Sequence, residues 1–257
     1  MSDEFFSHSS KGEQLTGRKR EADEGWALTR ADVLFLIDCT KTMEGSVNYI
    51  QGVRDSIEEI VNTFHKEKCR VRLALIEFRD RVHQDNEDAL RIHSFENGSF
   101  TDSIDEFSNA LEQLEPIGGG PEDESVFDAL LNGARELDWD PNGEHIMVLF
   151  SDAAPRRRDL EAKSPEDVIA ELEKAEIDQI HLLTKEEHRS RYEPLLYAQK
   201  ASGEDITGAI YELGHSEAMD EFRKKLLQIT KSSIGKMVAN KVRKGTGSSS
   251  NLIRQRK

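Results

Sequence analysis

The chain has 257 residues, of which 36% are hydrophobic and 33% are charged, so it can form one α/β core beneath a heavily charged surface. Its formal net charge of −15 disfavours general nucleic-acid binding, because a protein that neutralises phosphates needs a basic face. No run of about 18 apolar residues is present, which excludes an ordinary membrane-spanning helix, and the polar first residues lack the apolar core of a secretory signal. We therefore expect a cytoplasmic protein without a membrane partner.

The first part of the chain contains a polar segment and then a strongly apolar one. Residues 1–28 are polar and charged, and we expect them to form a flexible arm before a domain at 29–239. Residues 33–37 are a continuous apolar run, too short for a typical helix and too apolar for a strand with one wet face. This run predicts a strand that is covered on both sides, as in a parallel sheet.

Three oxygen-bearing side chains, Asp38, Thr40 and Thr42, alternate directly after this predicted strand. An open α/β sheet places its ligands at this point, outside the carboxyl ends of its strands. A carboxylate and two hydroxyls are hard ligands, which suit Mg²⁺, Mn²⁺ or Ca²⁺ better than zinc or copper. The alternative is a strand-to-helix turn in which Asp38 or Thr40 merely caps the next helix.

The next predicted elements alternate between helices and strands. Apolar residues recur at three- and four-residue spacing over 47–64, which predicts an amphipathic helix packed on a sheet. Residues 70–78 predict a second strand, residues 91–95 a short strand, and residues 104–114 another helix.

A glycine-rich segment, Gly118–Gly120, and the acidic run 122–124 precede a predicted helix over 126–137. Glycines let the backbone approach a ligand closely, and negative charge is favoured both by a cation and by the start of a helix. We expect Gly119 and Gly120 to take part in partner binding. The alternative is an ordinary loop whose acidic residues lie at the start of the helix and bind no cation.

A third loop follows the predicted strand 145–150 and contains Ser151, Asp152 and a proline turn. Three arginines come next, and we expect Arg156 to bind an acidic partner, although the cluster could instead balance the charge of the metal-site acids. The alternative is a solvated loop in which the arginines pair with Asp159 and Glu161.

The remaining chain continues the same alternation of helices and strands. Ser164 and Pro165 are typical of a helix start, and we expect a strand over 177–184, a charged helical segment over 185–200, a strand over 209–213 and a final helix from 219 to about 238. Residues 240–257 are basic with a Gly/Ser-rich middle, and we expect a disordered tail. This tail is the segment through which nucleic acid could be contacted.

The three loops together resemble the metal-binding loops of von Willebrand factor type A (VWA) domains. The run Asp38-x-Thr40-x-Thr42 is similar to the family's Asp-x-Ser-x-Ser, with threonine in place of both serines. The glycine-rich segment resembles the second loop, and Ser151–Pro155 resembles a third loop that often has Thr-Asp-Ala-Pro after an apolar run. The resemblance extends over about residues 30–230.

This resemblance implies a Rossmann-like α/β fold: a doubly wound, mostly parallel sheet flanked by helices on both faces. It also implies a metal-ion-dependent adhesion site (MIDAS), in which first-loop hydroxyls contact Mg²⁺ directly and Asp38 and Asp152 act mainly through bound waters. An ungapped comparison puts Pro121 where many intracellular members have an aspartate and Glu124 on their glutamate. The second-loop ligand is therefore Glu122, Asp123 or Glu124, or is missing, and we carry Glu124 forward as the fifth candidate.

By resemblance, the protein is not an enzyme but a metal-dependent interaction module, acting as an adaptor or regulator in an intracellular complex. Its partner would be a separate enzyme or assembly subunit that presents an acidic residue to the metal. One alternative is a metal-free scaffold on the same fold. Another is a haloacid dehalogenase-like Mg²⁺-dependent phosphohydrolase, although Thr40 occupies the position of that family's general acid and threonine cannot do that task at neutral pH.

Overall fold

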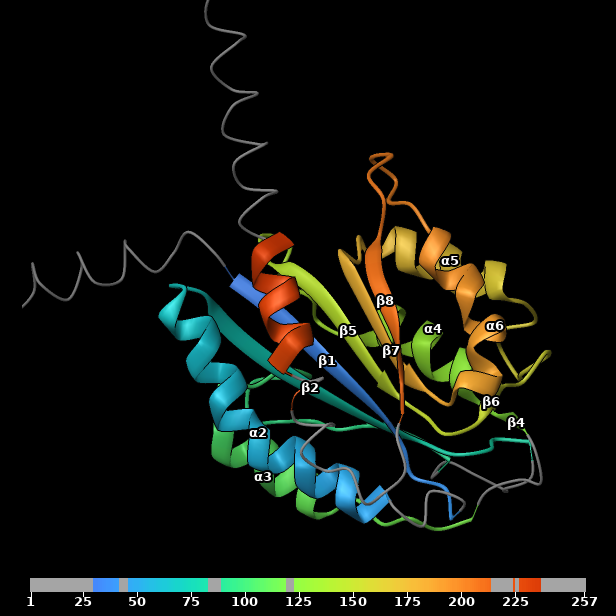
Figure 1. The fold of residues 1–257 in the computed structure, drawn as a ribbon, viewed down its shortest axis with the longest axis horizontal. Coiled ribbons are helices and arrows are strands. Elements are labelled where there is room, and N and C mark those ends of the chain that lie inside the picture. The colour runs from blue at the N-terminus through green and yellow to red at the C-terminus, as the bar shows by residue number, and fades with distance from the viewer. Residues whose placement is uncertain are drawn as a thin grey trace, which may run out of the picture.

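The fold is an α/β sandwich built on one six-stranded sheet (Figure 1). The computed structural model describes residues 30–41, 46–82, 89–118, 123–213, 224 and 227–236. The strand order is β3-β2-β1-β5-β7-β8, and every neighbouring pair is parallel except β2 with β3. The strands are β1 (Arg30–Asp38), β2 (Arg70–Phe78), β3 (Leu90–Ile92), β5 (Glu144–Phe150), β7 (Gln179–Thr184) and β8 (Thr207–Glu212). The expected doubly wound, mostly parallel sheet is thereby confirmed.

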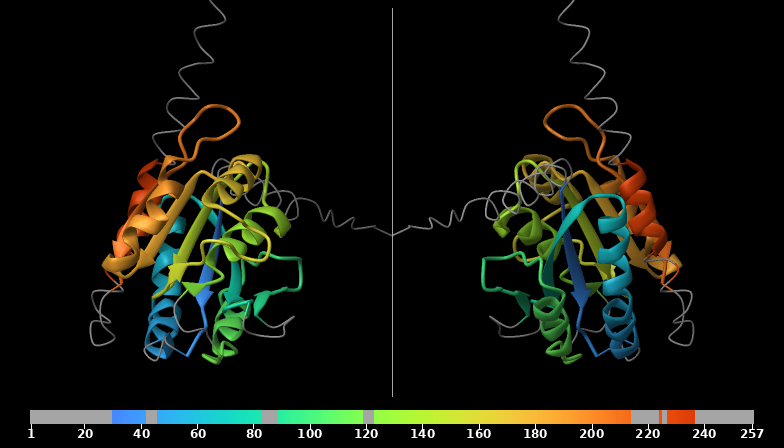
Figure 2. Two further views of the ribbon diagram at one scale, coloured as in Figure 1. Left: turned by 90° about the vertical axis from the view of Figure 1, so that its right-hand side faces the viewer. Right: turned by 90° about the vertical axis from the view of Figure 1, so that its left-hand side faces the viewer.

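Helices cover both faces of this sheet (Figures 1 and 2). The side of α2 (Ser46–Lys66) also carries α3 (Ile104–Glu112) and the helical residues 227–236. The other side carries α4 (Val126–Glu136), α5 (Pro165–Lys174) and the segment made of α6 (Arg189–Tyr192) and the 3₁₀ turn η2 (Glu193–Tyr197). A 3₁₀ turn, η1 (Glu186–His188), leads into α6. None of the helices that the structure describes is long and apolar enough to cross a membrane.

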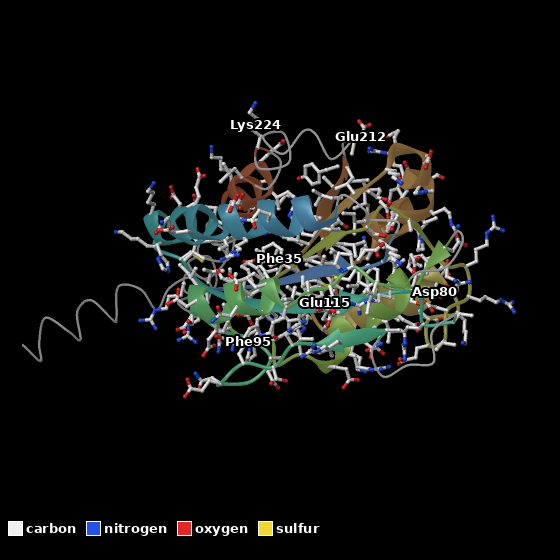
Figure 3. The ribbon with its side chains drawn as sticks, turned by 90° about the horizontal axis from the view of Figure 1, so that it is seen from below. Phe35, Asp80, Phe95, Glu115, Glu212 and Lys224 are labelled. Carbon is white, nitrogen blue, oxygen red and sulfur yellow. The ribbon has the colours of Figure 1, made fainter. Side chains whose placement is uncertain are left out.

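Strand β1 contributes to two separate cores because its side chains alternate between the sheet faces. Phe35 belongs to the core under α2 and α3 (Figure 3). Its ring centroid lies 5.5 Å from that of Phe107. Leu34 and Leu36 belong to the core under α4 and α5. The apolar run of this strand is therefore explained by burial on both faces, as predicted.

Two helix positions show how the sequence sets the local structure. Ser164 and Asp167 form a capping box at the start of α5, and Pro165 occupies its first turn, as expected for these residue types. Gly133 lets α4 approach the sheet, since a Cβ built there would lie only 2.7 Å from a methyl carbon of Leu34.

Some predicted boundaries differ from the observed ones. Residues 185–200 form two 3₁₀ turns around a single short α-helical turn, α6, rather than a longer helix. Pro194 lies in this segment and has no backbone N–H to donate to a continuous α-helix, which accounts for part of the break. The predicted arm at 1–28, the tail at 240–257 and the first turns of the final helix lie outside the described residues.

Candidate metal centre

Backbone hydrogen bonds join the first two candidate loops at the carboxyl edge of the sheet. The peptide oxygen of Cys39 accepts a hydrogen bond from the N–H of Ile117 at 3.0 Å. The N–H of Lys41 donates to the oxygen of Gly118, also at 3.0 Å. The chain that leads into the glycine-rich segment therefore runs beside the loop that follows β1.

A small two-stranded sheet joins the second and third loops. Its strands are β4 (Asp123–Glu124) and β6 (Ala154–Pro155), which pair in parallel. Directly after β6, the N–H of Arg156 donates to the peptide oxygen of Glu124 at 3.0 Å. All three loops predicted from the sequence are thus in contact, although they are far apart in the chain.

Asp38 lies at the centre of this arrangement and is fully buried. Its Oδ1 accepts hydrogen bonds from the N–H of Thr40 at 3.0 Å and from Thr40 Oγ1 at 2.7 Å. Its Oδ2 accepts a hydrogen bond from Ser151 Oγ at 2.8 Å. Strands β1 and β5 are neighbours with Ile37 opposite Phe150, which brings the next residues of each strand together.

Burial raises the pKa of Asp38 to about 6, because a charged carboxylate is poorly solvated there. The hydrogen bonds from Thr40 and Ser151 oppose this rise, and the negative charge of Asp152 adds to it. A positive charge placed between the two carboxylates would relieve both the burial penalty and their mutual repulsion.

Asp152 is the second carboxylate of the site and is 8% exposed. Its Oδ2 accepts a hydrogen bond from Lys185 Nζ at 3.0 Å. Its Oδ1 is buried and has no hydrogen-bond partner among the described residues. A buried carboxylate oxygen without a partner is costly, so this atom calls for a cation or a water molecule.

The donor set fits a hard divalent cation. Asp38, Thr40, Ser151 and Asp152 offer only carboxylate and hydroxyl oxygens, which suit magnesium, manganese or calcium. A hydroxyl that donates its hydrogen to Asp38 still has oxygen lone pairs with which to coordinate an ion. Within the described ranges, no group of three or more His, Cys, Asp or Glu residues could hold a metal ion. An ion here would therefore depend on the hydroxyl oxygens and on water.

The structure brings some of the predicted site residues together, whereas others lie outside the described residues or have an untested role. Asp38, Thr40 and Asp152 lie at one place, whereas Thr42, Gly119 and Gly120 lie outside the described residues. Glu124 is 1% exposed and sits in β4, where its backbone is tied to the third loop. Its role as a metal ligand remains a prediction.

Arg156 has internal partners in the structure. Its Nη2 donates to Asp80 Oδ2 at 2.6 Å and to the peptide oxygen of Asp123 at 2.7 Å. Its side chain therefore ties the loop after β2 to the second and third loops. The expected alternative pairing with Asp159 or Glu161 is not the one observed, because Asp80 takes the guanidinium. A role for Arg156 in partner binding remains a prediction.

Four further residues belong to the site and were not among the predicted ligands. Ser151 and Lys185 each follow a strand directly, so the rule that placed Asp38 at the sheet edge could have found them. Arg191 donates through Nη1 to Asp123 Oδ1 at 2.9 Å and through Nη2 to the peptide oxygen of Pro155. Tyr192 donates its hydroxyl hydrogen to the peptide oxygen of Ala153 at 2.8 Å. No sequence pattern pointed to these last two.

Comparisons with known proteins agree with the observed fold. A family model described as "von Willebrand factor type A domain" matches residues 32–225. No curated protein matches the chain.

Two solved structures show a similar fold. Proximal thread matrix protein 1 from the mussel byssus, described with a zinc-occupied MIDAS motif, aligns with a TM-score of 0.55 and 17% identity over 80% of this chain and 46% of its own. The pilus adhesin SpaC from Lactobacillus rhamnosus GG aligns with a TM-score of 0.52 and 13% identity over 80% of this chain and 31% of its own. The chain thus spans less than half the length of either protein, and the likeness concerns the fold.

Proposed function

The chain belongs to the family of von Willebrand factor type A domains, and we propose that it binds a divalent cation at Asp38, Thr40, Thr42 and Asp152 in order to dock another protein. The observation that carries this proposal is the buried Oδ1 of Asp152, which has no partner among the described residues and lies in a site with Asp38. Glu124 is the fifth candidate ligand. A MIDAS motif is described for the mussel thread protein, which has a similar fold.

The side chains have distinct tasks in this proposal. Asp38 orients the hydroxyls of Thr40 and Ser151 by accepting their hydrogens, so that their oxygens can face the ion. Asp152 supplies negative charge, and its buried Oδ1 would accept a hydrogen bond from a water molecule bound to the ion. When bound, Mg²⁺, Mn²⁺ or Ca²⁺ would supply an electrophilic centre for a carboxylate.

The partner proposed from this chemistry is a protein that presents an Asp or Glu side chain. A site with few directly bound anions leaves the cation able to accept one more, so the carboxylate would complete its coordination. We propose an adaptor or regulatory role in a cytoplasmic complex with a separate enzyme or assembly subunit. Both cysteines, Cys39 and Cys69, are buried thiols, which is compatible with a reducing compartment.

The test is isothermal titration of Mg²⁺ and Mn²⁺ into chelator-treated protein, alongside the double variant Asp38→Ala/Thr40→Ala. Saturable binding that is lost in the variant is expected. Thermal unfolding of the variant checks that it still folds, and Ser125→Ala, which removes a buried hydroxyl elsewhere, is the matched control and is expected to bind normally. Titrations of the wild type that show no heat and no saturation would contradict the proposed metal site.

A metal-free scaffold is the second candidate, and one contact favours it. Lys185 already places a positive charge on Asp152, so part of the site's negative charge is balanced within the chain. The same titration separates the two candidates. The phosphohydrolase alternative has less support, because Thr40 cannot serve as a general acid and donates its hydrogen to Asp38.

A further inference from the structure

Lys185 is a cation that the chain itself supplies to the candidate metal centre. Its Nζ lies 3.0 Å from Asp152 Oδ2, and its side chain is 46% exposed whereas that of Asp152 is 10% exposed. The acids that follow it have other partners, since Glu186 pairs with Arg189 and Glu187 with His188. Among the described residues, Asp152 is therefore the acid that Lys185 pairs with.

The sheet explains why this lysine reaches the site. Strands β5 and β7 are parallel neighbours, so their following residues meet at the carboxyl edge. The N–H of Ser151 donates to the peptide oxygen of Leu183 at 3.1 Å, and the N–H of Leu213 donates to that of Thr184 at 2.7 Å. The backbone before Lys185 is thus held on both sides, while the flexible stem of a lysine leaves its ammonium group free to swing.

We propose that Lys185 is a tethered counter-cation that competes with the divalent cation for Asp152 and thereby sets the affinity of the site. This inference rests on the proposed function. The ammonium group stabilises the ion-free site by neutralising Asp152. A divalent cation that binds next to Asp152 must either displace this group or tolerate its repulsion, and both effects weaken binding.

Two variants at residue 185 and one at a distant lysine test this inference. Lys185→Met keeps an unbranched stem and removes the charge, whereas Lys185→Arg keeps the charge. The matched control is Lys174→Met, because Lys174 forms a comparable pair with Glu171 at 3.2 Å on α5. Mg²⁺ and Mn²⁺ alone are the probes, titrated calorimetrically into chelator-treated full-length protein at low ionic strength.

We expect Lys185→Met to bind both ions about two- to tenfold more tightly than the wild type, as the loss of a partly exposed ion pair implies. Lys174→Met should bind like the wild type, and Lys185→Arg, which keeps a positive charge beside Asp152, should not show the tighter binding of Lys185→Met. Thermal unfolding gives a second readout. In chelator, Lys185→Met should unfold at a lower temperature than the wild type. Mn²⁺ should raise the unfolding temperature of Lys185→Met by more than it raises that of the wild type.

The outcomes distinguish this inference from the proposed function. If the wild type binds the ions and Lys185→Met binds them equally or more weakly, the competition is refuted and the metal site stands. If neither protein binds an ion, the metal site is refuted and the competition with it. Tighter binding that also occurs in Lys174→Met would show a general effect of surface charge, and would likewise refute a specific role for Lys185.

Discussion

Two regions of the molecule each bury a pair of aspartate carboxylates, and the hydrogen-bond donors around the carboxylates differ between the two regions. One is the candidate metal centre with Asp38 and Asp152. The other, here called the Asp128 cluster, consists of Arg81, Ser125, Asp128, Asp159 and Glu161 and lies where α4 meets the loop before α5. Both regions hold a carboxyl group whose charged form is disfavoured by burial, and the regions differ in the donors around their carboxylates.

In the Asp128 cluster, N–H donors occupy both oxygens of Asp128. Its Oδ1 accepts from the N–H groups of Glu161 at 3.0 Å and Ala162 at 2.8 Å, and its Oδ2 accepts from Arg81 Nη1 at 2.6 Å. Although partial burial of Glu161 acts in the opposite direction, hydrogen bonds from arginines lower the pKa of Glu161 to about 2. The hydrogen-bonding capacity of both Asp128 oxygens is therefore satisfied within the protein.

In the candidate metal centre, the hydrogen-bonding capacity of the carboxylates is satisfied less completely. Hydroxyls rather than N–H groups provide both side-chain hydrogen bonds to Asp38, and Asp152 Oδ1 has no partner among the described residues. An N–H donor has no lone pair for an ion, whereas a hydroxyl oxygen has two. This difference supports our proposal that the candidate metal centre binds a cation, whereas we propose a stabilising role for the Asp128 cluster. Four predictions follow this contrast, from the largest effect to the smallest.

Removal of Asp128 should have the largest effect. Asp128→Ala leaves two buried N–H groups without an acceptor and removes one partner of Arg81, so the free energy of unfolding should fall by about 3–5 kcal/mol. Urea unfolding at neutral pH in chelator measures this free energy of unfolding. Glu136→Ala on the same helix is the control and should change stability by about 0.5 kcal/mol or less, because Glu136 is exposed. A loss below about 1 kcal/mol for Asp128→Ala would contradict the structural role.

The pH dependence of Asp159 should be the next largest effect. Burial, together with the charge of Asp128, raises the pKa of Asp159 from 3.8 to about 6. The stability that this group contributes is therefore fully present below pH 3.8 and is lost as the pH rises through about 6.

Asp159→Asn lacks this titration, so it should gain stability relative to the wild type between about pH 4 and pH 7, on the order of 2 kcal/mol. Urea unfolding of both proteins at several pH values measures the difference, in which the titration of all other groups cancels. A difference that stays constant with pH would show that burial does not perturb Asp159.

Asp38→Asn should separate metal binding from stability. The amide keeps the shape of the carboxyl group but cannot provide negative charge, so Mn²⁺ should bind at least about tenfold more weakly, or 1.4 kcal/mol. The free energy of unfolding in chelator should change by only about 1 kcal/mol, because a buried charge is removed together with hydrogen bonds. Calorimetric titration and urea unfolding measure the two quantities. Equal Mn²⁺ affinities in Asp38→Asn and the wild type would rule out Asp38 as part of the site.

A matched pair of serine variants should give the smallest effects. Ser151 and Ser125 are both buried, and each donates a hydrogen bond to a buried carboxylate at 2.8 Å. Ser151→Ala and Ser125→Ala should each lower the free energy of unfolding by about 1 kcal/mol. Only Ser151→Ala should also weaken Mn²⁺ binding, by about threefold, because it releases one side of Asp38. Equal Mn²⁺ affinities in the two variants would remove the contrast between the regions.

Much of the fold could be predicted because local patterns reflect burial. The strand expected at 70–78 is β2 with the same bounds, since its side chains change from alternating to continuously apolar as the strand enters the core. Ser164 and Pro165 correctly indicated the start of α5. The segment 185–200 was less predictable, because charged residues favour a helix locally while Pro194 and the docking of Tyr192 and Leu195 divide it into short turns.

The candidate site was predicted in part. The sequence placed Asp38, Thr40 and Asp152 together, and the structure brings them to one place, because residues that follow parallel strands share one edge of the sheet. Their role in metal binding remains a prediction. Arg191 and Tyr192 could not be found in this way, since they lie on α6 and reach the loops only through the packing of that helix. It remains a prediction that Thr42 and Glu124 bind the metal and that Gly119 and Gly120 bind the partner.

The sequence by itself determined the alternation of helices and strands, and it determined which polar side chains follow each strand. Periodicity and strand ends are local properties, so no knowledge of distant contacts was required. Only the tertiary structure decided that β5 lies between β1 and β7, and that order brings Ser151 to Asp38 and Lys185 to Asp152. Strand order depends on how distant apolar faces pack together, and for this reason the balance of charge at the site emerged only with the fold.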